Sequence, residues 1–462
     1  MIWALTFCRH QFQNQVLVED RDAIHIAGSI KVSWQFMAAK VAFRVLVEET
    51  VLKATTNGMP LARLRGTAFF DPSRDALITS LPSFAQASQS IISAPNFVTH
   101  IGAQEVTRAT LQFIYQYFAR VDNVRYEEAA FESLWEDFTA EIQDPQWVTR
   151  GLANVRYFKC ESPQLDLGDG IVIKGRDFDD LASLGFVSPI LERLSEDWSG
   201  LGASSFVLVA EHSVAKNPDN VITLESGMVF TKALRAVGAL RLADAGSVSI
   251  GRMWMIRAAR FNFGIGGLQA VGVSIPAIGS QFVWSEKSAH LFPKIYRELA
   301  QLEQEGYGRS PGNLAVALRA FMATYDRWPS SADSQLLDSI TALEALLGNE
   351  TEISFKLAFR VASLLANNDD KRAELLRLVK GFYDTRSRLV HGGQLKEKHQ
   401  QYLARIEDLR VLVRRLLRSF VTFAATPPGV YGRKFFAEQL DVALVDAVAR
   451  EKLRFALGLD ED

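Results

Sequence analysis

The period of the hydrophobic pattern changes along this 462-residue chain, and that change constrains the fold more than any other feature. From about residue 150 to 290, short alternating or β-branched runs are broken by Gly, Asp and Asn, which predicts strands, mostly antiparallel. Beyond residue 313 the apolar residues recur every three or four positions, which predicts helices. Residues 1 to about 145 mix the two patterns. The sequence therefore predicts an α+β fold, with a mixed helix and antiparallel-sheet portion followed by an all-helical bundle.

The same changes in pattern divide the chain into segments. The predicted segments are a mixed α/β region (1–150), a mainly β region that can form one domain with it (151–305), an all-helical domain (312–425) and a helical tail (426–462). A cluster of Gly, Ser and Pro at 306–313 is the predicted linker before the helical domain.

Individual elements follow from these patterns. In the N-terminal part, helices are predicted at 33–53, 105–121 and 126–144, and short strands and turns at 66–86. Strands are predicted at 154–162, 165–175, 204–213, 220–226, 247–257 and 268–279. The glycines Gly168 and Gly170 predict a hairpin tip within 165–175. Helices are predicted at 292–306, 313–328, 333–347, 352–366, 369–391, 397–425 and 434–456. Candidate N-caps are Asp333, Thr351 and Asn368.

Composition excludes several classes of protein. The formal net charge is −2, so no overall positive field attracts nucleic acid or an anionic membrane, and any contact with a polyanion must be local. No run approaches the roughly 20 apolar residues that span a bilayer, and we expect no membrane partner. Cys8 and Cys160 are too few for a disulfide framework or a sulfur-ligated zinc site, and they fit a reducing, cytoplasmic location.

An arginine occupies an unexpected place in the predicted helix 369–391. At about 100° per residue, Arg386 falls in the middle of the apolar stripe. The apolar residues within about 60° of it are Leu375, Val379, Phe382, Leu389 and Val390. A buried guanidinium costs several kcal/mol unless a carboxylate pairs with it. Glu344 falls inside the apolar stripe of the predicted helix 333–347, so we expect the two side chains to pair.

A histidine ends the same predicted helix. His391 precedes Gly392 and Gly393, and glycines in this place are typical of left-handed helix caps. A histidine there is partly exposed, and its protonation state can change near neutral pH. The spacing by itself is weak evidence of a site, because arginine and histidine often lie near helix C-termini, where they interact favourably with the helix dipole.

The context of these residues resembles a known family. The sequence reads Y-x-x-R-S-x-L-V-H-G from Tyr383 to Gly392, and an earlier helix reads A-L-E-A-L-L from Ala342 to Leu347. In these motifs, and in their all-helical setting, residues 312–425 resemble the HEPN domains, and among them the Apea-like group. The resemblance covers about a quarter of the chain.

This resemblance implies a metal-independent endoribonuclease, of a kind often found in toxin or anti-phage defence systems. It carries over Arg386 and His391 as catalytic residues, with Glu344, Ser387 and Tyr383 in support. The residue types suit the chemistry. A histidine moves protons when the ribose 2′-OH attacks the adjacent phosphate. An arginine binds the charge that grows on the phosphoryl oxygens. No cofactor and no metal site is expected.

RNA is the expected partner. Residues 369–418 contain thirteen Lys and Arg against seven Asp and Glu, a local charge of +6. Within this basic patch, Arg388, Lys396 and Lys398 are candidate nucleic-acid contacts. A homodimer through the helical domain is also expected, because Arg386 and His391 lie about 140° apart around one helix. Two copies related by a twofold axis can place both pairs along one cleft. The N-terminal portion is then a sensor or recruitment module with an unknown trigger.

The sequence leaves two alternatives open. The domain can be a non-catalytic HEPN module that mediates dimerisation or nucleic-acid binding, with Arg386 and Glu344 as a structural ion pair that sets helix register. The whole protein can also be a scaffold. Other motifs are discounted: the glycines at 264–267 lack the residues of a nucleotide-binding loop, and the aspartates at 165–170 lack the further ligands of a calcium loop. The following histidines show no ligand spacing: His10, His25, His100, His212 and His290.

Overall fold

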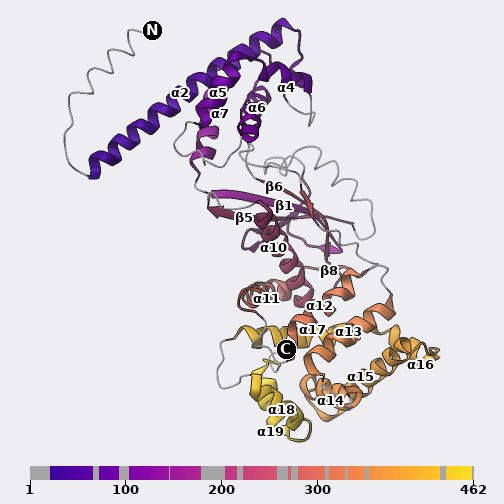
Figure 1. Cartoon of the computed structure of the whole chain (residues 1–462). Coiled ribbons are helices and arrows are strands. Elements are labelled where there is room, and N and C mark those ends of the chain that lie inside the picture. Colours follow the sequence, from indigo (N-terminus) through magenta and orange to yellow (C-terminus); the bar gives the residue numbers. More distant parts are fainter. Residues whose placement is uncertain are drawn as a thin grey trace. The chain divides into compact units, whose positions relative to one another are not determined.

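The computed structural model divides the chain into two compact units (Figure 1). The described residues are 21–65, 72–92, 103–144, 146–177, 203–215, 222–257, 269–271, 279–306, 312–327, 331–348, 353–426 and 433–459. The helical unit comprises Met1–Trp147, Val214–Asn220 and Arg257–Gly267. The sheet–bundle unit comprises Val148–Ser213, Val221–Ile256 and Leu268–Asp462.

Helices build the described N-terminal part of the helical unit. They are α2 (Arg21–Thr56), α3 (Leu61–Leu64), α4 (Pro72–Thr79), α5 (Pro82–Ile92), α6 (Ala103–Arg120) and α7 (Glu128–Gln143). The predicted strands and turns at 66–86 are therefore wrong over the described residues, where α4 and α5 lie, while 66–71 fall outside them. Both helices begin at a proline, whose fixed φ and missing N–H suit the first helical position.

Aromatic rings form the core of the helical unit. Phe43 of α2 lies 4.6 Å from Phe113 of α6 and 5.0 Å from Phe138 of α7, measured between ring centroids. Phe131 and Trp135 of α7 complete the cluster. These rings join α2 to the consecutive helices α6 and α7, so the helical unit has a core of its own.

The sheet–bundle unit begins with a sheet of six strands in the order β3-β4-β5-β1-β6-β7. The strands are β1 (Gln146–Arg156), β3 (Gln164–Gly168), β4 (Ile171–Gly175), β5 (Ala203–Ala215), β6 (Ser249–Arg257) and β7 (Gln269–Val271). Strand β3 pairs antiparallel with β4, β4 with β5, and β6 with β7. A small parallel pair joins β2 (Phe158–Lys159) to β8 (Phe282–Val283). The prediction of a mainly antiparallel sheet is confirmed at these antiparallel pairings.

The predicted hairpin at 165–175 is confirmed. Strands β3 and β4 turn through Gly168, Asp169 and Gly170, whose φ angles are 83°, 52° and 74°. Glycine adopts this left-handed region without steric cost, and aspartate is among the few other residues that tolerate it.

One predicted strand is a helix. Residues 222–226, predicted as part of a strand, begin α10 (Ile222–Ala243). In the first half of α10 the buried residues recur every three or four positions, at Val229, Ala233 and Ala236, and residues 236–243 are all buried. This periodicity outweighs the β-branched residues at the start of the segment, because a helix that buries one long apolar face gains more than a short strand.

Helices make up the described C-terminal part of the chain. They are α11 (Glu286–Glu305), α12 (Leu314–Asp326), α13 (Ala332–Leu347), α14 (Ile353–Leu365), α15 (Asp369–Val390), α16 (Glu397–Leu403), α17 (Ile406–Ala425), α18 (Arg433–Val445) and α19 (Ala447–Ala456). The predicted helix 397–425 is two helices that separate at 404–405. Of the candidate N-caps, Asn368 is confirmed, Asp333 is wrong because Ser331 caps α13, and Thr351 lies outside the described residues.

A single hydrophobic core runs through the sheet–bundle unit and includes residues of the sheet, of α10 and of the C-terminal helices. Buried arginines tie these parts together. Arg241 of α10 forms an ion pair with Asp326 of α12, and Arg414 of α17 donates from Nε to the carbonyl oxygen of Arg241 at 2.8 Å. The protein is thus a mixed α+β molecule in which the segments 151–305 and 312–425 share one core.

Candidate active site at the end of helix 15

Helix α15 presents Arg386 to neighbouring α13. The helix begins at the N-cap Asn368, whose side chain accepts the N–H of Lys371 at 2.8 Å. Its apolar stripe is buried through Leu375, Val379 and Phe382, and it packs against α13 and α14. The stripe therefore sets which way Arg386 points.

Arg386 and Glu344 form an ion pair, as expected from their places on the two helices. An Nη atom of Arg386 lies 3.6 Å from an Oε atom of Glu344. The side chains are 26% and 24% exposed, so the burial expected for the guanidinium is only partial. Glu344 lies in the last turn of α13 and Arg386 close to the end of α15, and each side chain keeps about a quarter of its surface exposed.

Tyr383 completes this group. The guanidinium carbon of Arg386 lies 5.8 Å from the centre of the Tyr383 ring. Burial raises the pKa of the Tyr383 hydroxyl, and the charge and hydrogen bonding of Glu344 raise it further. Within the described part of the chain, Nε of Arg386 has no hydrogen-bond partner. Arg386 is thus oriented by Glu344 and Tyr383 while part of its hydrogen-bonding capacity stays unused.

His391 ends α15, as predicted. Its backbone N–H donates to the carbonyl oxygen of Ser387 at 3.1 Å, and its side chain is exposed. Gly392 has a φ of 67°, and the N–H of Gly393 closes the cap on Arg388 at 2.9 Å. The cap points the chain away from the helix and leaves the imidazole in solvent.

Val390 departs from the predicted stripe. Its angular position places it with the apolar residues, yet its side chain is 52% exposed. The helix ends directly after it, at the C-cap residue His391. Angular position predicts burial only where a neighbouring helix is present.

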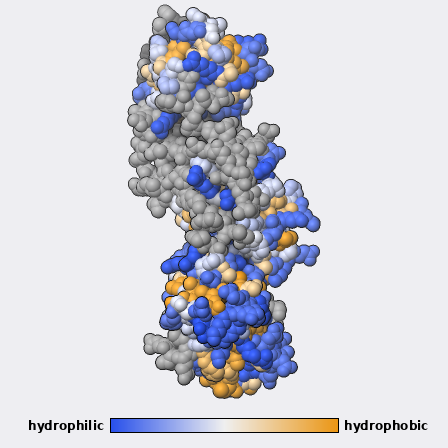
Figure 2. Space-filling view, turned by 90° about the vertical axis from the view of Figure 1, so that its right-hand side faces the viewer, coloured by the Kyte–Doolittle hydropathy of each residue, from blue (hydrophilic) through white to orange (hydrophobic). Residues whose placement is uncertain are grey.

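The candidate nucleic-acid contacts lie on the surface near this helix end. Arg388, Lys396 and Lys398 are exposed, and Ser387 is half-buried. Other members of the basic patch are not available to a phosphate backbone, because Arg410 and Arg414 are buried against α12. Figure 2 looks onto the side that carries α16, and hydrophilic residues cover much of its lower part, beside apolar ones.

Sequence reasoning missed His399. This residue lies eight positions after His391, within the short helix α16, and its side chain is 1% exposed. The signal available in the sequence is its position three residues after Lys396, from which a side chain inside a helix can accept the backbone N–H of the N-cap residue. The sequence pattern does not show that it is buried.

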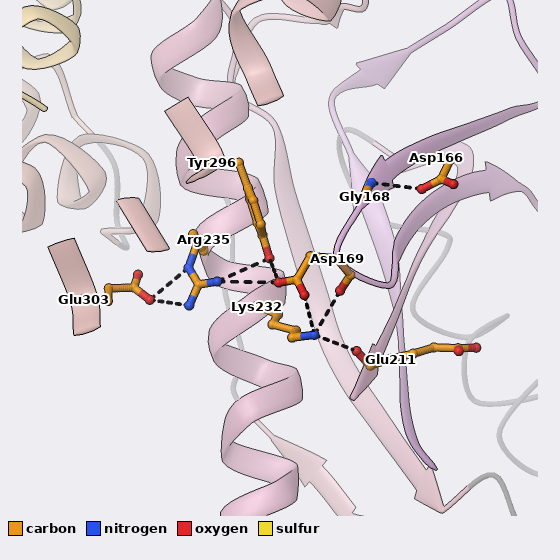
Figure 3. A network of polar contacts seen from close by, with 8 residues as sticks. All are labelled: Asp166, Gly168, Asp169, Glu211, Lys232, Arg235, Tyr296 and Glu303. Carbon is orange, nitrogen blue, oxygen red and sulfur yellow. Dashed lines mark hydrogen bonds and ion pairs between the residues drawn. The ribbon is translucent and has the colours of Figure 1, made fainter. Parts of the chain in front are cut away.

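The hairpin aspartates have structural partners. Lys232 donates from Nζ to the carboxylate and to the backbone oxygen of Asp169, both at 2.9 Å, and Tyr296 donates to the same carboxylate at 2.8 Å (Figure 3). Arg235 lies next to this group and pairs with Glu303. The network attaches the β3–β4 turn to α10 and α11. Asp166 accepts the N–H of Gly168 within the hairpin.

No described helix combines the length and the hydropathy that crossing a bilayer demands. Nor do three or more His, Cys, Asp or Glu side chains cluster, over the described ranges, in the way that metal ligands do. The glycines at 264–267 lie outside those ranges.

No family model matches the chain, and neither a curated protein nor a solved structure matches it significantly. The link to the HEPN domains therefore depends on the motif and its helical setting.

Proposed function

We propose that this protein is a metal-independent endoribonuclease of the HEPN type, with Arg386 and His391 as its catalytic residues. The observation that carries the proposal is the partly exposed guanidinium of Arg386, oriented by Glu344 across 3.6 Å, five residues before an exposed histidine at the end of the same helix.

The arrangement suits cleavage through the ribose 2′-OH. About a quarter of the Arg386 side chain is exposed beside Glu344, so the guanidinium can bind a phosphoryl oxygen from the solvent side. His391 is exposed, so its imidazole is accessible as the group that transfers the proton of the ribose 2′-OH. The products of such a reaction are a 2′,3′-cyclic phosphate and a free 5′-OH. Exposed Arg388, Lys396 and Lys398 lie where they can hold the RNA backbone.

The helical unit is the proposed sensor or recruitment module, in a defence system against phage or of the toxin type. Its support is a separate hydrophobic core, which allows it to respond to a trigger without unfolding the sheet–bundle unit.

Incubation of RNA with the purified full chain in EDTA tests the activity. We expect cleavage that survives chelation and leaves cyclic phosphate ends. His391→Ala removes the proton-transfer group and should abolish cleavage. His290→Ala is the matched control, because His290 is an equally exposed histidine on α11, and it should cleave like the wild type.

A non-catalytic HEPN module is the second candidate. The observation that favours it is the ion pair itself, since Glu344 and Arg386 can serve only to set the register of α13 and α15. In that case the chain binds RNA, and His391→Ala leaves binding intact with no cleavage by any variant. Cleavage that is equal in wild type and His391→Ala would contradict the first candidate.

A further inference from the structure

His399 is a buried cap of a surface helix. Its Nδ1 accepts the backbone N–H of Lys396 at 3.0 Å, at the start of α16. A nitrogen that accepts a hydrogen bond carries no proton, so the proton of the neutral ring lies on Nε2. Among the described residues, Nε2 has no hydrogen-bond partner. The neutral imidazole therefore adopts the tautomer with its proton on Nε2.

Cations surround this imidazole. Burial lowers the pKa of His399, and the charges of Arg388, Lys398 and Lys396 lower it further, while Asp384 opposes them. Arg388 and Asp384 belong to α15, and both lysines lie at the start of α16. Helix α13 also contacts α16.

The acidic residues in the middle and at the end of α13 already have ion-pair partners. Asp338 pairs with Arg327, and Glu344 pairs with Arg386; Asp333 lies in the first turn. Neither of the two paired acids is free to compensate a positive charge on His399. These neighbours therefore favour the neutral form of the ring over the protonated form.

A second contact holds α16 on α15 without involving charge. The ring of Tyr402 lies over Gly381, and a Cβ atom on residue 381 would come within 2.0 Å of the Tyr402 Cζ atom. The Tyr402 ring also meets Phe382 at 5.4 Å between centroids. Only glycine at 381 permits this close approach. Helix α16 thus has one apolar attachment through Tyr402 and one polar attachment through His399.

We propose that His399 is a positioning residue for RNA binding: its neutral imidazole fixes the start of α16, so that Lys396 and Lys398 lie beside Arg388, and its protonation releases them. This inference rests on the proposed function, because it assigns those three cations to RNA phosphates.

The physical basis is the loss of an acceptor. A second proton must go to Nδ1, where it meets the N–H of Lys396, so a hydrogen bond is replaced by two opposed donors. The folded protein holds the pKa of this histidine below its ordinary value of about 6.5, whereas the released segment restores that value. The attachment is then complete above about pH 6.5 and weakens as pH falls below it.

Two variants of the full chain separate this role from simple packing. His399→Asn keeps an acceptor in the place of Nδ1 but does not titrate. Gly381→Ala displaces Tyr402 and loosens α16 at every pH. Hydrogen exchange of the amides at 396–403, corrected for intrinsic rates, is measured without RNA at about pH 7.5 and about pH 5.5, on either side of the ordinary histidine pKa. Affinity for a single-stranded 2′-O-methyl RNA, which cannot be cleaved, is measured at the same two pH values.

We expect acidification to lower both the amide protection and the RNA affinity of the wild type. The loss of RNA affinity in the wild type should exceed the loss in His399→Asn by about fivefold or more. His399→Asn should keep its amide protection at both pH values. Gly381→Ala should have low amide protection and low RNA affinity at both. Equal pH dependence in wild type and His399→Asn would overturn the proposal. A different outcome is that amide protection falls with pH in the wild type but not in His399→Asn, while the chain binds no RNA at either pH. That outcome would refute the proposed function, and with it the assignment to RNA.

Discussion

At the scale of the residue, neighbouring side chains orient Arg386 while part of its side chain stays exposed. One contact of 3.6 Å to Glu344 and the face of Tyr383 orient the guanidinium, yet about a quarter of its side chain remains exposed. A fully buried pair would be a poor anion site, because a phosphate would have to displace the carboxylate and enter a desolvated region.

Arg386→Ala should lower the free energy of unfolding by about 1 to 2 kcal/mol, between the values for exposed and for buried pairs, because Glu344 loses its partner. Urea denaturation measures this change. Glu344→Gln in the same background should restore part of the loss, since it removes the unpaired charge. If Arg386→Ala unfolds like the wild type, the ion pair does not stabilise the fold.

His391→Ala should leave the free energy of unfolding within about 0.5 kcal/mol of wild type, because the imidazole is exposed and the helix cap uses only its backbone. The same denaturation experiment applies. Gly392→Ala is the informative comparison, since the φ of 67° strains any residue with a side chain and should cost more than the loss of the imidazole. Equal stability of the two variants would contradict the cap.

At the scale of the element, the β3–β4 hairpin is attached by charge. Burial opposes ionisation of Asp169, but hydrogen bonds from Lys232 and Tyr296 outweigh it and lower the pKa of the carboxyl. An acid whose pKa is lowered by folding stabilises the fold above its unfolded pKa, about 3.9, and this contribution disappears as pH falls through the folded pKa.

Asp169→Asn should therefore reduce the free energy of unfolding by about 1 kcal/mol at neutral pH, a modest value because the carboxylate is partly exposed. The difference from wild type should close as pH falls below about 4. Asp166→Asn on the same hairpin is the control, because Asp166 binds only a turn N–H and should show a smaller effect. A loss that persists unchanged in acid would exclude the ionic attachment.

At the scale of the whole molecule, two hydrophobic cores lie in one chain. Phe113 belongs to the core of the helical unit, and Leu417 to the core that the sheet shares with the C-terminal helices. Elements that share a core unfold together, whereas separate cores allow separate transitions.

Calorimetry of the full chain should show two unfolding transitions. Phe113→Ala should lower the midpoint temperature of one transition and Leu417→Ala that of the other, each by several degrees. Replacing a large buried side chain with alanine costs about 2 to 5 kcal/mol. Reporters in the sheet and in α15 should lose structure in the same transition. One transition that both variants lower would show that the units unfold as one.

Dimerisation is the last expectation at this scale. A twofold contact would use the flank of α15 that carries Asp384, Ser387, Arg388 and His391, of which Ser387 is half-buried and the rest exposed. Because the contact would also include part of the basic segment 397–425, phosphate or uncleavable RNA should tighten the dimer in sedimentation of the full chain. A strict monomer with and without RNA would rule out a site composed of two chains and favour the binding module.

Much of the fold follows from local pattern. Helix α15 could be predicted from its cap at Asn368 to its end at Gly392, because a long periodic stripe and its caps are properties of neighbouring residues. The pairing of Glu344 with Arg386 was also predictable, since each charge stands in an apolar stripe and needs a partner. Short segments such as 72–92 and 222–226 were not, because proline and β-branched residues serve in turns, strands and helix starts alike.

The sequence by itself determined the helices with long periodic stripes, their caps, the hairpin glycines and the chemical types at the candidate site. Only the tertiary structure decided how exposed each of those groups is. It buried His399 and Arg414, left Val390 in solvent, and joined the sheet and the C-terminal helices in one core. Exposure depends on contacts between residues far apart in the chain, and a local pattern carries no information about which element will cover a given face.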